Sequence, residues 1–155
     1  LKRPWTPKVL PIQLFILGDV ALAGFPFEIT TIAGKRLRKT LEETLAQRGV
    51  TRVILCPYAN GYSGYMTTYE EYQAQIYEGG HTVFGQWSLA ALQTKFEALA
   101  KEMLKPKEER KFVHDAIPPD FTEEELNHFP FYKRAWYIRQ ELIRARKMER
   151  KGTAA

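Results

Sequence analysis

The chain has 155 residues, of which 45% are apolar and 26% are charged, and its formal net charge is +5. This length suits one domain of ordinary size, and the composition excludes a wholly disordered chain. No apolar run approaches the roughly 20 residues that a membrane-spanning helix needs. Cys56 is the only cysteine, which excludes an intrachain disulfide and a cysteine-based zinc knuckle.

The positive charge is concentrated at the C-terminal end. Residues 133–155 contain eight Lys and Arg against two Glu, a net of +6, so the other 132 residues carry a net of −1. This asymmetry predicts two units with different roles. The chain begins at Leu1 without the features of a signal peptide, so we expect a processed product, a fragment or part of a longer protein.

The first half of the chain predicts a mixed α/β layer. Residues 11–26 form two apolar runs around Gly18-Asp19, which predicts a β-hairpin. A helix should begin at Thr30 or Thr31, either of which can cap its free amides, and end near Gly49. Its buried positions recur every four residues: Ile29, Ala33, Leu37, Leu41 and Leu45. The apolar run at residues 50–57 predicts a strand buried on both faces.

Residues 58–85 alternate tyrosine with glycine and show no regular period. Aromatic side chains on glycine-rich loops are common at binding sites, but a surface loop that covers the edge of the core is an equal alternative. A second helix is predicted over residues 87–104, with Leu92, Phe96, Leu99 and Met103 on one stripe. We therefore expect one domain over residues 1–104.

Residues 105–121 predict a charged, proline-containing linker, and residues 122–155 a basic helical extension. The extension begins with the Thr-x-x-Glu spacing of a capping box at residues 122–125. Residues 130–151 follow a helical period with one apolar and one strongly basic face.

Two segments, FPFEITTIAGKRLR and NGYSGYMTTYEEYQAQIYEGGHTVFG, closely resemble the C-terminal part of the catalytic domain of neutral (non-lysosomal) ceramidases. These are zinc-dependent amidases that hydrolyse the N-acyl amide of ceramide to sphingosine and a fatty acid. The resemblance covers about residues 5–104, whereas residues 107–155 resemble no family that we identify.

The resemblance implies three site residues. Glu28, before the Thr-Thr-x-Ala-Gly run, and Tyr65, at the end of Gly-Tyr-x-Gly-Tyr, correspond to zinc ligands. Tyr77 corresponds to the tyrosine that hydrogen-bonds the scissile carbonyl oxygen. Each has a structural alternative, because a carboxylate such as Glu28 also stabilises a helix N-terminus, and tyrosines are ordinary packing residues.

The family's zinc also requires two histidines from a more N-terminal segment, and its active-site serine lies in a further segment; this chain contains neither segment. Its three histidines are His81, His114 and His128, and His81 is interpreted as a surface residue. We therefore expect zinc and ceramide hydrolysis only if another segment or chain completes the site. The sequence leaves two alternatives open: the chain is part of an active ceramidase-type enzyme, or it is an inactive ceramidase-derived subunit of a larger complex.

The basic extension predicts a partner. Its candidate partner-binding residues are Arg139, Arg144, Arg146, Lys147, Arg150 and Lys151. There are three alternatives for this helix: a solvated face, binding to an anionic membrane surface, or binding to an acidic partner such as another protein chain, a large assembly or RNA. Nucleic-acid binding is supported by the positive charge alone, because the sequence contains no nucleic-acid-binding motif. An active ceramidase piece would work at a membrane surface outside the cytoplasm, and a structural subunit in an organelle such as the mitochondrion.

Overall fold

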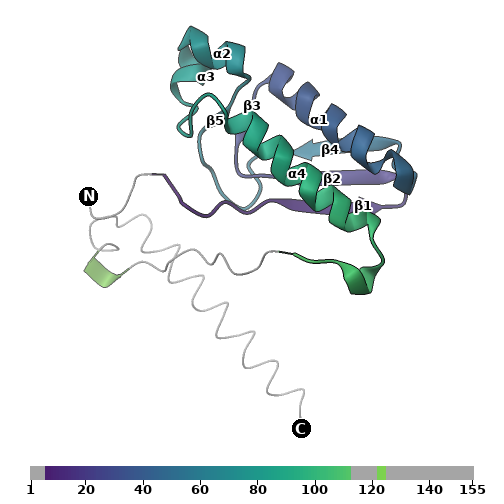
Figure 1. The fold of residues 1–155 in the computed structure, drawn as a ribbon. Helices are drawn as coiled ribbons and strands as arrows, with labels where there is room; N and C mark the ends of the chain where they lie inside the picture. The colour runs from purple at the N-terminus through teal and green to yellow at the C-terminus, as the bar shows by residue number, and fades with distance from the viewer. Residues whose placement is uncertain (1–5, 113–121, 125–155) are drawn as a thin grey trace. The chain divides into compact units, whose positions relative to one another are not determined.

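The computed structural model describes residues 6–112 and 122–124 (Figure 1). The chain divides into two units, Leu1–Pro118 and Pro119–Ala155, and nearly all described residues belong to the first. Of the predicted helical extension the structure describes only residues 122–124; Glu125 of the predicted capping box and the six candidate partner-binding residues lie outside the described part. The linker and extension boundaries therefore stay predictions.

The main sheet has three strands in the order β1-β2-β4. β1 (Gln13–Leu17) and β2 (Val20–Gly24) form an antiparallel hairpin, and β4 (Arg52–Cys56) pairs with β2 in parallel. Gly18, in the hairpin turn, has a φ of 62°, a conformation that glycine adopts without steric cost. The predicted hairpin and the mixed α/β class are both confirmed.

Two helices cover one face of this sheet, α1 (Thr31–Leu45) and α4 (Ser88–Leu104), and they also pack against each other (Figure 1). The predicted apolar stripe of α1 is confirmed for Ala33, Leu37, Leu41 and Leu45, which are fully buried. Ile29 instead belongs to the short strand before the helix, and it is partly buried against the core. A 3₁₀ turn, Ala46–Arg48, follows α1 and ends at Gly49 with a φ of 77°. Phe96 of α4 meets Phe25 edge to face, with the ring centroids 6.0 Å apart, which joins this helix to the end of β2.

The start of α1 differs from the prediction in one respect. Thr30 occupies the N-cap position, but its side chain caps no amide of α1. The Thr30 hydroxyl instead donates a 2.6 Å hydrogen bond to Glu71 Oε2, because that charged acceptor lies within reach. This threonine therefore connects two segments that are distant in sequence.

The second face of the sheet is open, contrary to the prediction for β4. Val53 is buried beneath the helices, whereas Ile54, on the opposite side of the strand, is 43% exposed. The apolar composition of β4 predicts burial on both faces, but the described residues supply a helical layer on one face only.

A second, two-stranded parallel sheet joins β3 (Glu28–Ile29) to β5 (Tyr65–Met66). Two short helices follow it, α2 (Tyr69–Ala74) and α3 (Tyr77–Gly80), at one end of the molecule's first unit (Figure 1). The tyrosine- and glycine-rich segment is thus partly regular. Across the described ranges, 6–112 and 122–124, no helix is long and apolar enough to cross a membrane.

Candidate functional site

The small sheet brings Glu28 and Tyr65 together. The two residues are direct partners in the parallel pairing of β3 with β5, and the backbone amide of Glu28 donates to the Gly64 carbonyl at 3.0 Å. Paired residues on neighbouring strands project to the same face of a sheet. Two residues 37 positions apart in sequence are therefore neighbours.

Three phenols surround the Glu28 carboxylate. The Tyr62 hydroxyl donates to Glu28 Oε2 at 3.1 Å. The pKa of Glu28 lies below its usual value, chiefly through a hydrogen bond from Tyr65, with smaller contributions from Tyr58 and Tyr62 that act against desolvation. The same bond stabilises the protonated phenol and raises the pKa of Tyr65 to about 12. Without a cation nearby, the site therefore holds a carboxylate and neutral phenols at neutral pH.

Tyr77 contacts Tyr65. The two rings meet edge to face with centroids 5.7 Å apart, and the Tyr77 side chain is 66% exposed. Because this phenol is exposed to solvent and does not belong to the core, packing alone does not explain a tyrosine at this position. All three residues that the family resemblance implies are thus brought together.

His81 is also part of the cluster. Its side chain is exposed, as the sequence predicts. Its ring lies 4.6 Å from the Tyr77 ring, between centroids, and its Nδ1 is 2.7 Å from the Tyr77 carbonyl oxygen. Its own carbonyl accepts the amide of Tyr65 at 3.1 Å, which holds α3 against β5.

Two backbone features shape the cluster. Gly64 has a φ of +79°, and a Cβ there would lie 2.7 Å from the His81 carbonyl oxygen, so only glycine permits this close approach. Tyr58 has a φ of 58°, which is uncommon for a bulky residue and stores strain that the surrounding structure must offset. This conformation accompanies the parallel stacking of Tyr58 on Tyr62, with centroids 6.1 Å apart.

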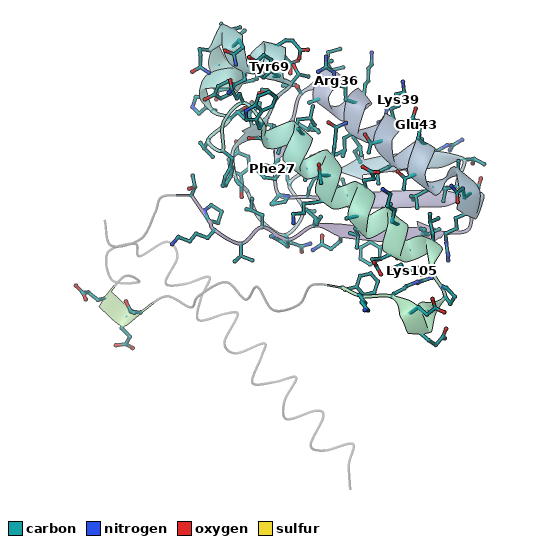
Figure 2. The ribbon with its side chains drawn as sticks, in the orientation of Figure 1. Phe27, Arg36, Lys39, Glu43, Tyr69 and Lys105 are labelled. Carbon is teal, nitrogen blue, oxygen red and sulfur yellow. The ribbon has the colours of Figure 1, made fainter. Side chains whose placement is uncertain are left out.

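α2 fixes this region to α1. Thr68 and Glu71 form a reciprocal capping box, and the same Glu71 carboxylate accepts the Thr30 hydroxyl. Arg36 of α1 forms a double hydrogen bond to Glu70, at 2.9 and 3.1 Å, and Figure 2 shows Arg36 at the end of α1 that lies near Tyr69 of α2. The strand that carries Glu28 and the helix that follows Tyr65 are therefore held together by side-chain bonds.

The donor set of the described residues fits part of a zinc site. Glu28 and Tyr65 supply a carboxylate and a phenol oxygen side by side, which suits a hard or borderline cation. Catalytic zinc uses three or more protein ligands, and the described ranges contain no group of three His, Cys, Asp or Glu side chains suited to a metal. The pair fits as two ligands of a shared site and not as a complete one.

Sequence reasoning missed Tyr58 and Tyr62 as members of this site. The signal available was their position in the Tyr-Ala-Asn-Gly-Tyr run just before the predicted ligand Tyr65. A polar groove between α1 and α4, lined by residues such as Thr44 and Lys101, contains none of the site residues. Tyr58, Tyr62 and Tyr77 are 53%, 59% and 66% exposed, so the cluster lies open on the surface of this unit.

Residues 1–94 match the family model described as neutral/alkaline non-lysosomal ceramidase, N-terminal. The neutral ceramidase of Pseudomonas aeruginosa is 43% identical over 119 residues, which are 77% of this chain and 17% of that protein. Neutral ceramidase A of Dictyostelium discoideum is 39% identical over 130 residues, 83% of this chain and 17% of that protein. The similarity to the Dictyostelium protein covers 83% of this chain, which is more than the two-thirds that we expected from the resemblance over residues 5–104.

The solved structure of the neutral ceramidase from Pseudomonas aeruginosa superposes with a TM-score of 0.70 at 44% identity, over 76% of this chain and 18% of that one. A ceramidase structure described as complexed with C2 gives the same values. The chain thus spans less than a fifth of the length of these relatives. It belongs to the neutral/alkaline non-lysosomal ceramidase family.

Proposed function

We propose that this chain contributes one part of the active site of a ceramidase-type zinc amidohydrolase. The single observation that carries the proposal is the direct pairing of Glu28 with Tyr65 on β3 and β5, with Tyr77 against Tyr65. The residues that the family resemblance implies lie far apart in sequence, and a coincidental resemblance would not require them to meet. The substrate proposed is ceramide, cleaved at its N-acyl amide.

In this proposal Glu28 and Tyr65 hold zinc together with ligands from another segment or another chain. Zinc supplies Lewis acidity, which polarises a carbonyl and makes water a competent nucleophile at neutral pH. Tyr62 orients the Glu28 carboxylate through its 3.1 Å hydrogen bond. Tyr77 donates a hydrogen bond to the amide oxygen as negative charge develops there.

The test combines the 155-residue chain with the part of the Pseudomonas aeruginosa enzyme that does not align with it. We expect a complex that contains zinc and hydrolyses a fluorescent ceramide. Glu28→Ala and Tyr65→Phe should lose the zinc, as measured by mass spectrometry, whereas the surface controls Glu43→Ala and Tyr69→Phe should keep it.

Tyr77→Phe separates the two roles within the site. It should retain zinc but slow hydrolysis by about 100- to 1,000-fold, the usual effect of removing one oxyanion donor. A folded complex that never binds zinc, or zinc that survives Glu28→Ala, would contradict the proposal.

The second candidate function is an inactive structural subunit, and the observation that favours it is that residues 6–112 and 122–124 contain no group of three His, Cys, Asp or Glu side chains suited to a metal. In that case the basic residues 139–151 would attach the chain to a larger assembly. A stable complex without zinc or hydrolysis is the outcome that this candidate expects.

A further inference from the structure

Glu71 lies beside the candidate site and takes no part in the proposed chemistry. It is the third residue of α2, and it is partly buried. Its carboxylate oxygen Oε2 accepts two hydrogen bonds, one from the Thr30 hydroxyl at 2.6 Å and one from the Thr68 backbone amide at 2.8 Å. A single atom therefore joins two segments of the chain, and Thr30 and Glu71 lie 41 positions apart in the sequence.

The two donors adjoin the strands that carry the proposed metal ligands. Thr30 directly follows β3, which contains Glu28, and Thr68 lies two residues after β5, which begins with Tyr65. The backbone amide of Thr30 also donates to the Met66 carbonyl at 3.0 Å, so the contact between the two segments extends beyond β3. The shared carboxylate thus bonds both segments just beyond the paired residues.

A capping box accounts for only part of this arrangement. Thr68 and Glu71 exchange the two bonds of that motif, which satisfies backbone amides at the start of α2. The bond from Thr30 lies outside the motif and adds nothing to the cap. It joins a hydroxyl to a carboxylate, and hydrogen bonds to charged groups contribute more than those between neutral groups.

The pairing of β3 with β5 needs support from outside because each strand has only two residues. So short a pair has too few alternating side chains to fix its own register. A slip of one residue would place the Glu28 side chain on the face opposite to that of Tyr65. Bonds from a third element, α2, oppose that slip.

We propose that Glu71 is a positioning residue of the candidate metal site: by bonding Thr30 and Thr68 through one carboxylate oxygen, it fixes the register that sets Glu28 beside Tyr65. The metal-binding part of this inference rests on the proposed function, whereas the register concerns the chain alone. Removal of such supporting partners usually weakens metal binding by about 10- to 100-fold.

Amide hydrogen exchange, followed by NMR on the full chain, measures the pairing directly. The backbone amides of Glu28 and Thr30 donate across it, to the carbonyls of Gly64 and Met66. In Glu71→Ala we expect both amides to exchange at least about 10-fold faster, because the lost bonds to a charged group shift the local opening equilibrium by at least that factor.

Glu102→Ala is the matched control. The Glu102 carboxylate accepts two bonds of the same lengths, 2.6 Å from Lys105 Nζ and 2.8 Å from the Lys111 amide, at the C-terminal end of α4. Figure 2 shows Lys105 at the end of α4 that lies away from Tyr69 of α2. This variant should therefore leave the exchange of the amides that join β3 to β5 unchanged.

Two further variants separate the bonds that Glu71 makes. Glu71→Gln should stay within about 5-fold of the unmodified chain, because its amide oxygen can accept both bonds, although more weakly than a carboxylate does. Thr30→Val removes only the bond that lies outside the capping box. It should accelerate exchange of the Glu28 amide by about 10-fold, and it decides the question if Glu71→Ala does not fold.

Zinc binding gives the second measurement. In the complex of this chain with the remainder of the Pseudomonas aeruginosa enzyme, Glu71→Ala should weaken zinc binding by at least about 10-fold, as measured by competition with a chelator. Glu102→Ala should bind zinc as the unmodified chain does.

Three results would overturn the inference: exchange at Glu28 that neither Glu71→Ala nor Thr30→Val accelerates; equal acceleration in Glu102→Ala; or unchanged zinc affinity in a complex that contains Glu71→Ala. If the unmodified complex binds no zinc, the proposed function fails, and the exchange rates alone decide whether Glu71 fixes the pairing.

Discussion

Gly64→Ala should destabilise the first unit more than the same substitution at a glycine where an added Cβ would contact nothing. The backbone of Gly64 has a φ of +79°, and a Cβ would lie 2.7 Å from the His81 carbonyl oxygen. The left-handed conformation costs alanine about 1–2 kcal/mol. Relief of the backbone contact costs a further 1–3 kcal/mol or so, as overpacking usually does. That contact involves main chain, which cannot rotate away.

Gly49→Ala is the matched control. Gly49 has a φ of +77°, but nothing lies within 4 Å of the position of its Cβ. Both substitutions share the left-handed penalty and the gain of about 0.4–1 kcal/mol from a less flexible unfolded chain. The difference between them therefore isolates the contact with His81.

Urea denaturation of the full chain, followed by circular dichroism, measures this difference. We expect the free energy of unfolding to fall by about 1–3 kcal/mol more for Gly64→Ala than for Gly49→Ala, with unchanged m-values. The close packing of β5 against His81 would be refuted by equal losses for the two variants.

Three further predictions concern the supports of the site. The pKa of Glu70 is lowered to about 2, chiefly by its hydrogen bond with Arg36, so its contribution to stability is fully present above its ordinary pKa of 4.5 and is lost as the pH falls towards 2; Glu70→Gln should flatten this part of the acid unfolding curve. The pKa of Tyr65 is raised to about 12, chiefly by Glu28, so ultraviolet titration should find one late phenol that moves towards 10.0 in Glu28→Gln, and an unchanged titration would contradict the cluster. Thr30→Val should cost about 1.5–3 kcal/mol of unfolding free energy, since it removes a hydrogen bond to a charged group, whereas the exposed control Thr94→Val should stay within about 0.5 kcal/mol.

The regular elements of the fold were predictable because their signals are local. α1 and α4 repeat apolar residues at helical spacing, and Gly49 and Lys105-Pro106 mark where these helical segments end. The hairpin has a Gly-Asp turn between two apolar runs. α2 was also within reach, since Thr68 and Glu71 have the spacing of a capping box.

The pairing of β3 with β5 had no such local signal. Each strand is two residues long, and the 35 residues 30–64 lie between the end of β3 and the start of β5, so periodicity does not predict their contact. Family resemblance identified Glu28, Tyr65 and Tyr77 individually, but it did not predict that Tyr58 and Tyr62 share the Glu28 carboxylate. Those contacts depend on a strained backbone at Tyr58, which no propensity favours.

Two sets of exposed aromatic and apolar side chains lie on separate elements of this unit. Tyr77 and the phenols near Glu28 face solvent at the small sheet, and Phe15 and Leu17 face solvent on the main sheet. A domain that buried its own core fully would need neither exposure, and a surface adapted to water would replace both sets with polar side chains. The zinc measurements on Glu28→Ala and Tyr65→Phe distinguish a part of an active site from a scaffold that retains the same fold.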